Sequence, residues 1–157
     1  MQKTVAQTDN NQSLNNVFSA YIKVKNALTT DNGDSVRIAA KALFNIIDKV
    51  SMEKLSAEQH KVWMQYAKDL SYHSEHMKGT DELEHQREHF MTLSTVMYKA
   101  MKALNVNTTE IYFQFCPMAN DGKGAYWVSE QSKISNPYMG KTMPICGSTK
   151  DTIKVKP

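Results

Sequence analysis

Two short segments near the end of the chain each combine a cysteine, a proline and a methionine. In the first, Pro117 separates Cys116 from Met118, and in the second a proline lies between Met143 and Cys146. Side chains alternate along an extended strand, so Cys116 and Met118 would point to the same side. Thiolate and thioether sulfur select Cu(I) over hard cations. The four sulfur residues therefore predict a Cu(I) site, provided that the two segments converge.

The same two cysteines also fit a structural disulfide. In the chain-entropy model, a bond between Cys116 and Cys146 would stabilise the fold by about 3–4 kcal/mol. Met118 and Met143 would then be core residues that pack against the aromatic pair at 126–127. The spacing of the cysteines does not decide between a disulfide and a pair of thiolate ligands.

Four of the five histidines lie within seventeen residues, on both sides of a Gly-Thr turn at residues 79–80. His73 and His76 are three positions apart, and His85 and His89 are four apart, so each pair shares one helical face. An antiparallel pair of helices would bring both sets to the same end of a bundle. We expect one or two of His76, His85 and His89 to complete or border the metal site.

Catalytic arrangements are weak in this sequence. Residues 85–89 read His-Gln-Arg-Glu-His, which lacks the glutamate position of an HExxH zinc hydrolase. Ser129 and Ser148 have no evident base, and the chain has no glycine-rich phosphate loop. We expect no enzyme activity, and an enzyme that uses the histidines is the less favoured alternative. His60 stands apart from the others, and we expect it on the surface.

The composition points to one domain without a nucleic-acid or membrane role. The chain has 157 residues and a net charge of +3, with acidic and basic residues interspersed. Nucleic-acid binders usually concentrate their basic residues on one face. No apolar run approaches the roughly 20 residues that span a bilayer, so we expect no membrane insertion. Most of the ten methionines are expected to fill the core, because methionine adapts to irregular gaps.

Apolar residues recur at helical spacing in four stretches. The predicted helices run from about Ser13 to Thr29, from Val36 to Val50, from a capping box at Ser56 to Gly79, and from Thr80 to Leu104. Gly79 is expected to end its helix in the left-handed conformation that glycine tolerates. Long helices with short connections predict a mainly α fold, an up-down four-helix bundle.

The tail, residues 106–157, has a different pattern. Short β-prone runs at 111–115, 124–128 and 152–155 predict strands that are separated by turns. We expect a small β-rich C-terminal cap that packs on the bundle of residues 13–105, so that 13–157 form a single domain. Residues 1–12 are expected to be a disordered leader. They contain no apolar signal segment, which fits a cytosolic protein or an exported protein without its signal peptide.

Several of these segments resemble a known bacterial family. The motifs are Phe-Cys-Pro-Met-Ala at 115–119, Gly-Ala-Tyr-Trp-Val-Ser at 124–129, Asn-Pro-Tyr-Met-Gly at 136–140, and His-Gln-Arg-Glu-His-Phe at 85–90. Together they resemble a domain family of unknown function that occurs as small secreted proteins. The same domain occurs appended to the periplasmic adaptor subunits of copper and silver efflux pumps. The resemblance extends from about Leu14 to Ile153.

The resemblance implies a periplasmic or secreted protein with a heavy-metal association. With the residues above, it predicts a Cu(I)-type binding domain that captures the metal ion or hands it to an adaptor or efflux-pump component. The alternative is a structural or protein-interaction module that has a Cys116–Cys146 disulfide and no metal.

Overall fold

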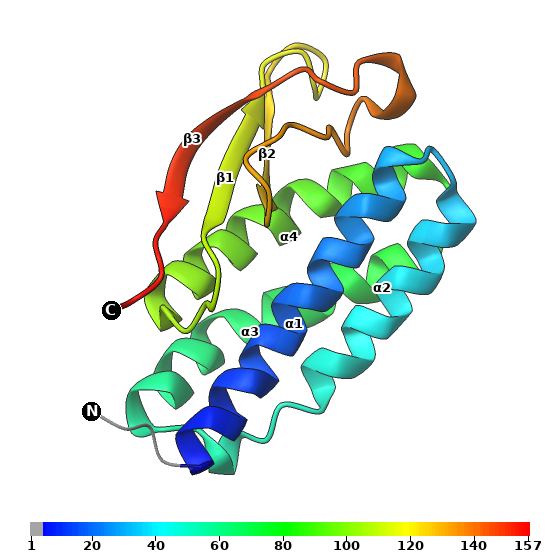
Figure 1. Cartoon of the computed structure of the whole chain (residues 1–157). Coiled ribbons are helices and arrows are strands. Elements are labelled where there is room, and N and C mark those ends of the chain that lie inside the picture. The colour runs from blue at the N-terminus through cyan, green and yellow to red at the C-terminus, as the bar shows by residue number, and fades with distance from the viewer. Residues whose placement is uncertain (1–4) are drawn as a thin grey trace.

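Four helices are followed by a small antiparallel sheet in the computed structural model, which describes residues 5–157 and side chains from Asn10 onward (Figure 1). The helices are α1 (Val5–Thr29), α2 (Gly33–Asp48), α3 (Ala57–Lys78) and α4 (Leu83–Leu104), with a short 3-10 turn η1 (Met52–Lys54) before α3. The predicted fold class is therefore confirmed. None of the helices in this part of the chain combines the length and the apolarity needed to cross a bilayer.

The first helix starts earlier than predicted. It begins at Val5, eight residues before the expected start at Ser13, so it includes most of the segment that we expected to be a disordered leader. The first four residues of that leader lie outside the described residues. The polar segment can continue the helix because it contains no glycine or proline. It also has a partner, since the Gln59 side chain donates a hydrogen bond to Oδ1 of Asn11 at 3.0 Å.

Local signals set the other helix ends. Ser56 and Gln59 form the predicted capping box at the start of α3. The expectation for Gly79 was wrong, because its φ of −86° is right-handed. Its N–H donates to the carbonyl oxygen of His76, so the helix closes in a tight last turn without a left-handed residue.

The tail forms a three-stranded antiparallel sheet with the order β2-β1-β3. Its strands are β1 (Ile111–Cys116), β2 (Ala125–Ser129) and β3 (Ser148–Ile153), and a second 3-10 turn, η2 (Gly140–Thr142), precedes β3. β3 begins four residues before the predicted start at Thr152. It pairs with β1 from Ser148 opposite Phe115 to its end, with a bulge between Phe113 and Gln114.

The sheet packs on α4 and α1 through β2. One buried tyrosine joins the three elements. The hydroxyl of Tyr21 in α1 lies 2.7 Å from Oγ of Ser94 in α4 and accepts a hydrogen bond from the N–H of Val128 in β2 at 3.0 Å. Trp127 and Phe90 are also buried in this layer. The tail and the bundle therefore share one hydrophobic core.

Candidate metal centre at the turn between α3 and α4

The connection between α3 and α4 is short and firmly held. It passes the start of α2 so closely that a Cβ atom added to Gly33 would lie 1.8 Å from the carbonyl oxygen of Asp81. The side chain of Gln86 is fully buried and donates to the carbonyl oxygens of Gly33 at 2.8 Å and Thr80 at 2.7 Å. These contacts hold the α3–α4 connection and the first turn of α4 against the start of α2.

This arrangement brings three of the predicted ligands together. His76, His85 and His89, called the histidine triad below, each offer one ring nitrogen, and the three nitrogens lie within 4.8 Å of one another. The rings of His76 and His89 stack with their centroids 4.7 Å apart, and the ring of His85 lies edge-on to His89 at the same separation. Helical spacing and the tight connection together place these donors on one patch.

His73 and Tyr72 border the triad on α3. Nδ1 of His73 lies 3.0 Å from Nδ1 of His89. The ring centroid of Tyr72 lies 4.4 Å from that of His76 and 5.0 Å from that of His73. Tyr72 was missed by the sequence analysis, although its spacing of four residues from His76 would have indicated a contact on one helical face.

Burial favours the neutral form of the central histidine. The pKa of His89 is lowered from its usual value of 6.5 to about 4, mainly by burial and also by repulsion from His73, His76 and His85 when these are protonated. Burial also lowers the pKa of His73, against the attraction of Asp69. His89 is therefore uncharged at neutral pH, and a neutral imidazole is the form that binds metal ions.

The two cysteines converge on each other instead of on the histidines. Cys116 and Cys146 form a disulfide, with their Cα atoms 5.6 Å apart, and no free cysteine remains between residues 5 and 157. A disulfide needs Cα atoms at about this separation. The expected thiolate ligands were therefore wrong for this structure, and the alternative of a disulfide is confirmed.

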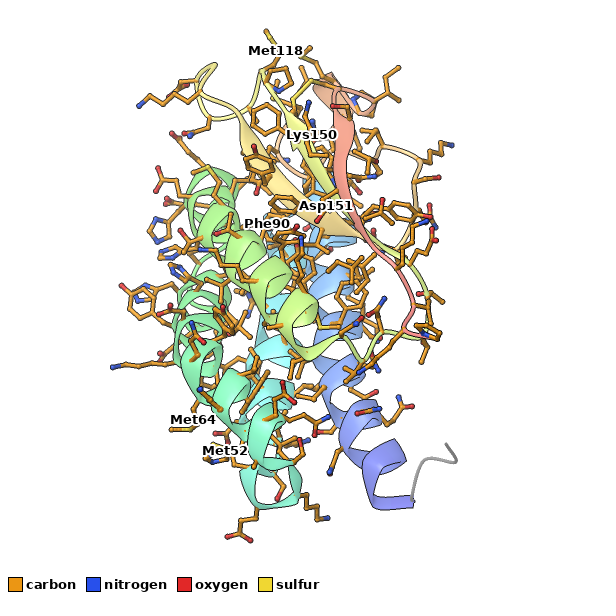
Figure 2. The ribbon with its side chains drawn as sticks, turned by 90° about the vertical axis from the view of Figure 1, so that its left-hand side faces the viewer. Met52, Met64, Phe90, Met118, Lys150 and Asp151 are labelled. Atoms are coloured by element: carbon orange, nitrogen blue, oxygen red, sulfur yellow. A yellow bond between two sulfur atoms is a disulfide. The ribbon has the colours of Figure 1, made fainter. Side chains whose placement is uncertain are left out.

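The two predicted thioether ligands lie in the tail, outside the two helices that carry the triad. Met118 is 56% exposed and projects from the tip of the sheet (Figure 2). Met143 is half-buried in the loop before Cys146. The expected core packing of Met118 was thus also wrong. Buried methionines occur in the helices instead, at Met77, Met97 and Met101.

The tail does reach the end of the bundle where the triad lies, but on another face of α4. Arg87 donates to the carbonyl oxygen of Pro137 at 2.9 Å and forms an ion pair with Asp31 at 2.6 Å. Arg87 is two positions from both His85 and His89, so its side chain leaves the helix about 200° away from theirs. The segment around Pro137 therefore contacts the side of α4 opposite the histidines.

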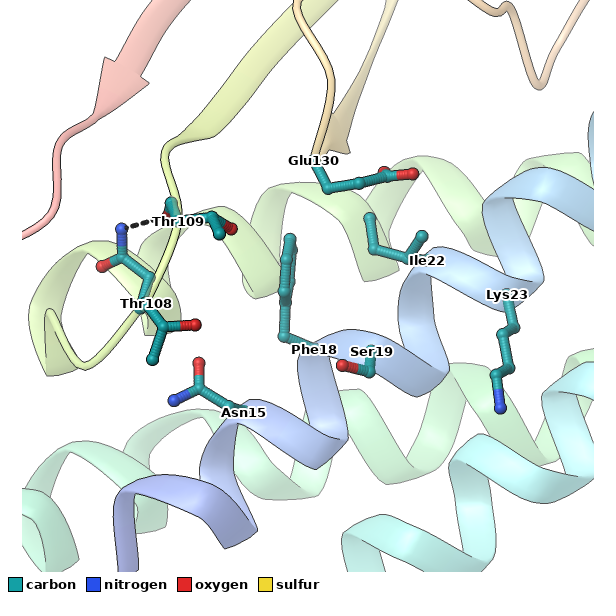
Figure 3. Close-up of a pocket in the computed structure, with 9 residues that line it drawn as sticks. Asn15, Phe18, Ser19, Ile22, Lys23, Thr108, Thr109 and Glu130 are labelled. Carbon is teal, nitrogen blue, oxygen red and sulfur yellow. Dashed lines mark hydrogen bonds between the residues drawn. The ribbon is translucent and has the colours of Figure 1, made fainter. Parts of the chain in front are cut away.

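A shallow cavity elsewhere contains none of the histidines. It has a volume of about 270 Å³ and lies beside α1, where Phe18, Lys23, Thr108 and Glu130 are among its lining residues (Figure 3).

His60, the fifth histidine, is exposed on α3, as expected, and lies outside the triad.

Comparison with known proteins finds one match. A family described as "Protein of unknown function (DUF3347)" matches residues 17–109. This range covers most of α1, the other three helices and the start of the tail, and it ends before β1. No curated protein and no solved structure matches the chain.

Proposed function

Because the chain belongs to the DUF3347 family, whose function is unknown, we propose a function from its own residues: it is a binding domain for a heavy-metal ion. The ligands are His76, His85 and His89. The observation that carries the proposal is that three ring nitrogens from two helices lie within 4.8 Å of one another.

The donor set favours borderline metals over Cu(I). Imidazole suits copper, zinc and nickel ions, and among divalent ions of this series Cu(II) is bound most tightly. The sequence predicted Cu(I) from two thiolates and two thioethers, and the two cysteine sulfurs are joined in the disulfide. We therefore propose Cu(II) as the first candidate and Zn(II) and Ni(II) as the next.

The disulfide supports an exported location. Disulfides persist in the bacterial periplasm and in other oxidising compartments and are rare in the cytosol. We propose that the domain captures the metal ion there or hands it to an efflux system. The role that we propose is binding without catalysis, and His76 and His85 are exposed, so an ion can reach them from solvent.

The test is a titration of tag-free protein with Cu(II), Zn(II) and Ni(II) by calorimetry. Loss of an outer partner of a metal ligand typically costs about 10–100-fold in affinity, so loss of a ligand in His85→Gln is expected to cost at least about 100-fold. His60→Gln is the matched control, because His60 is an exposed histidine outside the triad. Weak binding without a defined stoichiometry, or equal affinities in the two variants, would contradict the proposal.

A second candidate function rests on the disulfide alone. In it the chain is a structural or protein-interaction module whose tail is fixed to the bundle by Cys116–Cys146, and it binds no metal. The same titration separates the two candidates, because this module predicts no stoichiometric metal complex.

A further inference from the structure

His73 lies beside the histidine triad but is not one of its members. Nδ1 of His73 and Nδ1 of His89 are 3.0 Å apart, which is the length of an ordinary hydrogen bond. A neutral imidazole has one N–H donor and one acceptor nitrogen. One of these two Nδ1 atoms therefore carries a proton and donates the hydrogen bond, and the other accepts the hydrogen bond.

This contact leaves one nitrogen of His89 for a metal ion. Because Nδ1 of His89 faces His73, the nitrogen open for coordination is Nε2. A metal at Nε2 uses the lone pair there, so the single proton of the neutral ring resides on Nδ1. His89 then donates to His73, whose Nδ1 has to be the acceptor.

We propose that His73 is a positioning residue that holds His89 in the orientation and the Nδ1–H tautomer needed for metal binding. The inference rests on the proposed metal function. Metal-bound histidines commonly donate their second N–H to a carboxylate, a carbonyl or a water, which orients the ring and makes it a better ligand. Here a second imidazole takes that place.

The surroundings of His73 suit this role better than a role as a ligand. Its nitrogens are not among the mutually close donor atoms, which come from His76, His85 and His89. Its ring is half-buried and meets the ring of Tyr72 edge-on, with the centroids 5.0 Å apart. The acceptor is therefore held between α3 and α4 before any metal arrives.

Two substitutions at the same position separate the hydrogen bond from the side-chain bulk. In His73→Asn the amide Oδ1 takes the place of Nδ1 as an acceptor, whereas His73→Leu has no acceptor. We expect Cu(II) affinity to fall by about 10–100-fold in His73→Leu and to stay within a few-fold of the wild type in His73→Asn. His60→Leu is the control for loss of a histidine from the surface of α3.

Nitrogen-15 NMR of the imidazole rings gives a readout that a purely structural role would not change. With Zn(II) as a diamagnetic probe, wild-type His89 is expected as the Nδ1–H tautomer with the metal on Nε2. Equal Cu(II) affinity in His73→Leu and wild type would overturn the inference, as would a His89 ring coordinated through Nδ1. Equal weakness of His73→Asn and His73→Leu would also overturn it, because His73 would then act through more than its acceptor.

These outcomes are distinct from failure of the proposed function. If wild-type protein and His60→Leu bind neither ion stoichiometrically, the metal centre itself is refuted. If wild-type protein and His60→Leu both bind the metal ions, and only the affinities of the His73 variants differ from those expected, the metal centre is retained and the role of His73 is refuted. If His73→Leu does not fold, the Cu(II) affinity of His73→Asn and the NMR spectrum of the wild type still test the role of His73.

Discussion

The histidine triad and the disulfide-linked tail contain the histidines and the cysteines that were predicted to bind metal, and the fold arranges these two sets differently. The triad keeps its three donors separate, and two of them are exposed. In the tail, Cys116 is fully buried and its sulfur is bonded to that of Cys146. Helical spacing thus places the three histidine nitrogens close together with no covalent bond between them. In the tail, the strand β1 and the loop before β3 are held together by the disulfide. Metal affinity and tail stability should therefore respond to different substitutions.

The largest expected effect separates the two regions directly. Replacing both cysteines in Cys116→Ser/Cys146→Ser removes the link across a loop with a sequence separation of 30. The free energy of unfolding is expected to fall by about 3–4 kcal/mol, because the unfolded chain regains the entropy that the loop had lost. Urea unfolding of wild type and variant measures this difference.

Metal titration of the same double variant is the control. We expect its Cu(II) affinity to match the wild type under conditions where it is folded, because the triad contains no sulfur. A large loss of metal affinity without loss of stability would contradict the comparison, since the tail sulfurs would then be part of the metal site.

A smaller effect tests the non-covalent link between tail and bundle. Arg87 is 20% exposed, forms an ion pair with Asp31, and donates to a tail carbonyl. Arg87→Met is expected to destabilise the protein by about 2 kcal/mol, because charged hydrogen bonds of this kind contribute about 1.5–3 kcal/mol. Arg37→Met is the matched control: its ion pair with Asp34 is also 2.6 Å long but more exposed, and such surface pairs contribute about 0–1 kcal/mol. If Arg87→Met and Arg37→Met lose the same stability in thermal or urea unfolding, the contact of Arg87 with the tail does not add to the stability that its ion pair provides.

The smallest effect is a pH dependence of the metal-free triad. The pKa of His89 is about 4 in the folded protein and near 6.5 in an unfolded chain, so the unfolded state binds more protons between these values. Stability that is fully present above pH 6.5 should therefore decrease as the pH falls towards 4. Carboxylates also titrate in the lower part of this range, so the test compares urea unfolding of wild type with His89→Gln, which should lose part of this decrease. If His89→Gln and wild type show the same pH profile, His89 is not the group responsible.

The local parts of the fold could be predicted from sequence because their causes are local. Apolar spacing identified all four helices, and the pair Ser56 and Gln59 marked the start of α3. The predicted start of α1 at Ser13 was wrong, because a polar segment without glycine or proline can be helical, and here Gln59 supplies a partner for Asn11. The residue type of Gly79 predicts a left-handed conformation, whereas the tight closing turn needs no left-handed residue.

The long-range parts of the site could be predicted only where a short connection determines them. The turn between α3 and α4 made the convergence of the histidines predictable. For Cys116 and Cys146 the spacing allowed a disulfide or two ligands, and only the approach of the segments decides between them. The hydrogen bond between His73 and His89 depends on the register of two packed helices, which residue types do not reveal.

The backbone contact between Gly33 and Asp81 bears on the speed of the proposed metal binding. Since there is no space for a side chain between these two segments, the first turn of α2 packs directly against the α3–α4 connection and restricts its movement. With the metal function proposed above, an arriving ion would meet donors whose helices need no rearrangement, so association would cost little backbone conformational entropy. This contact therefore favours metal binding whose rate is limited by diffusion and ligand exchange, without a slow folding step.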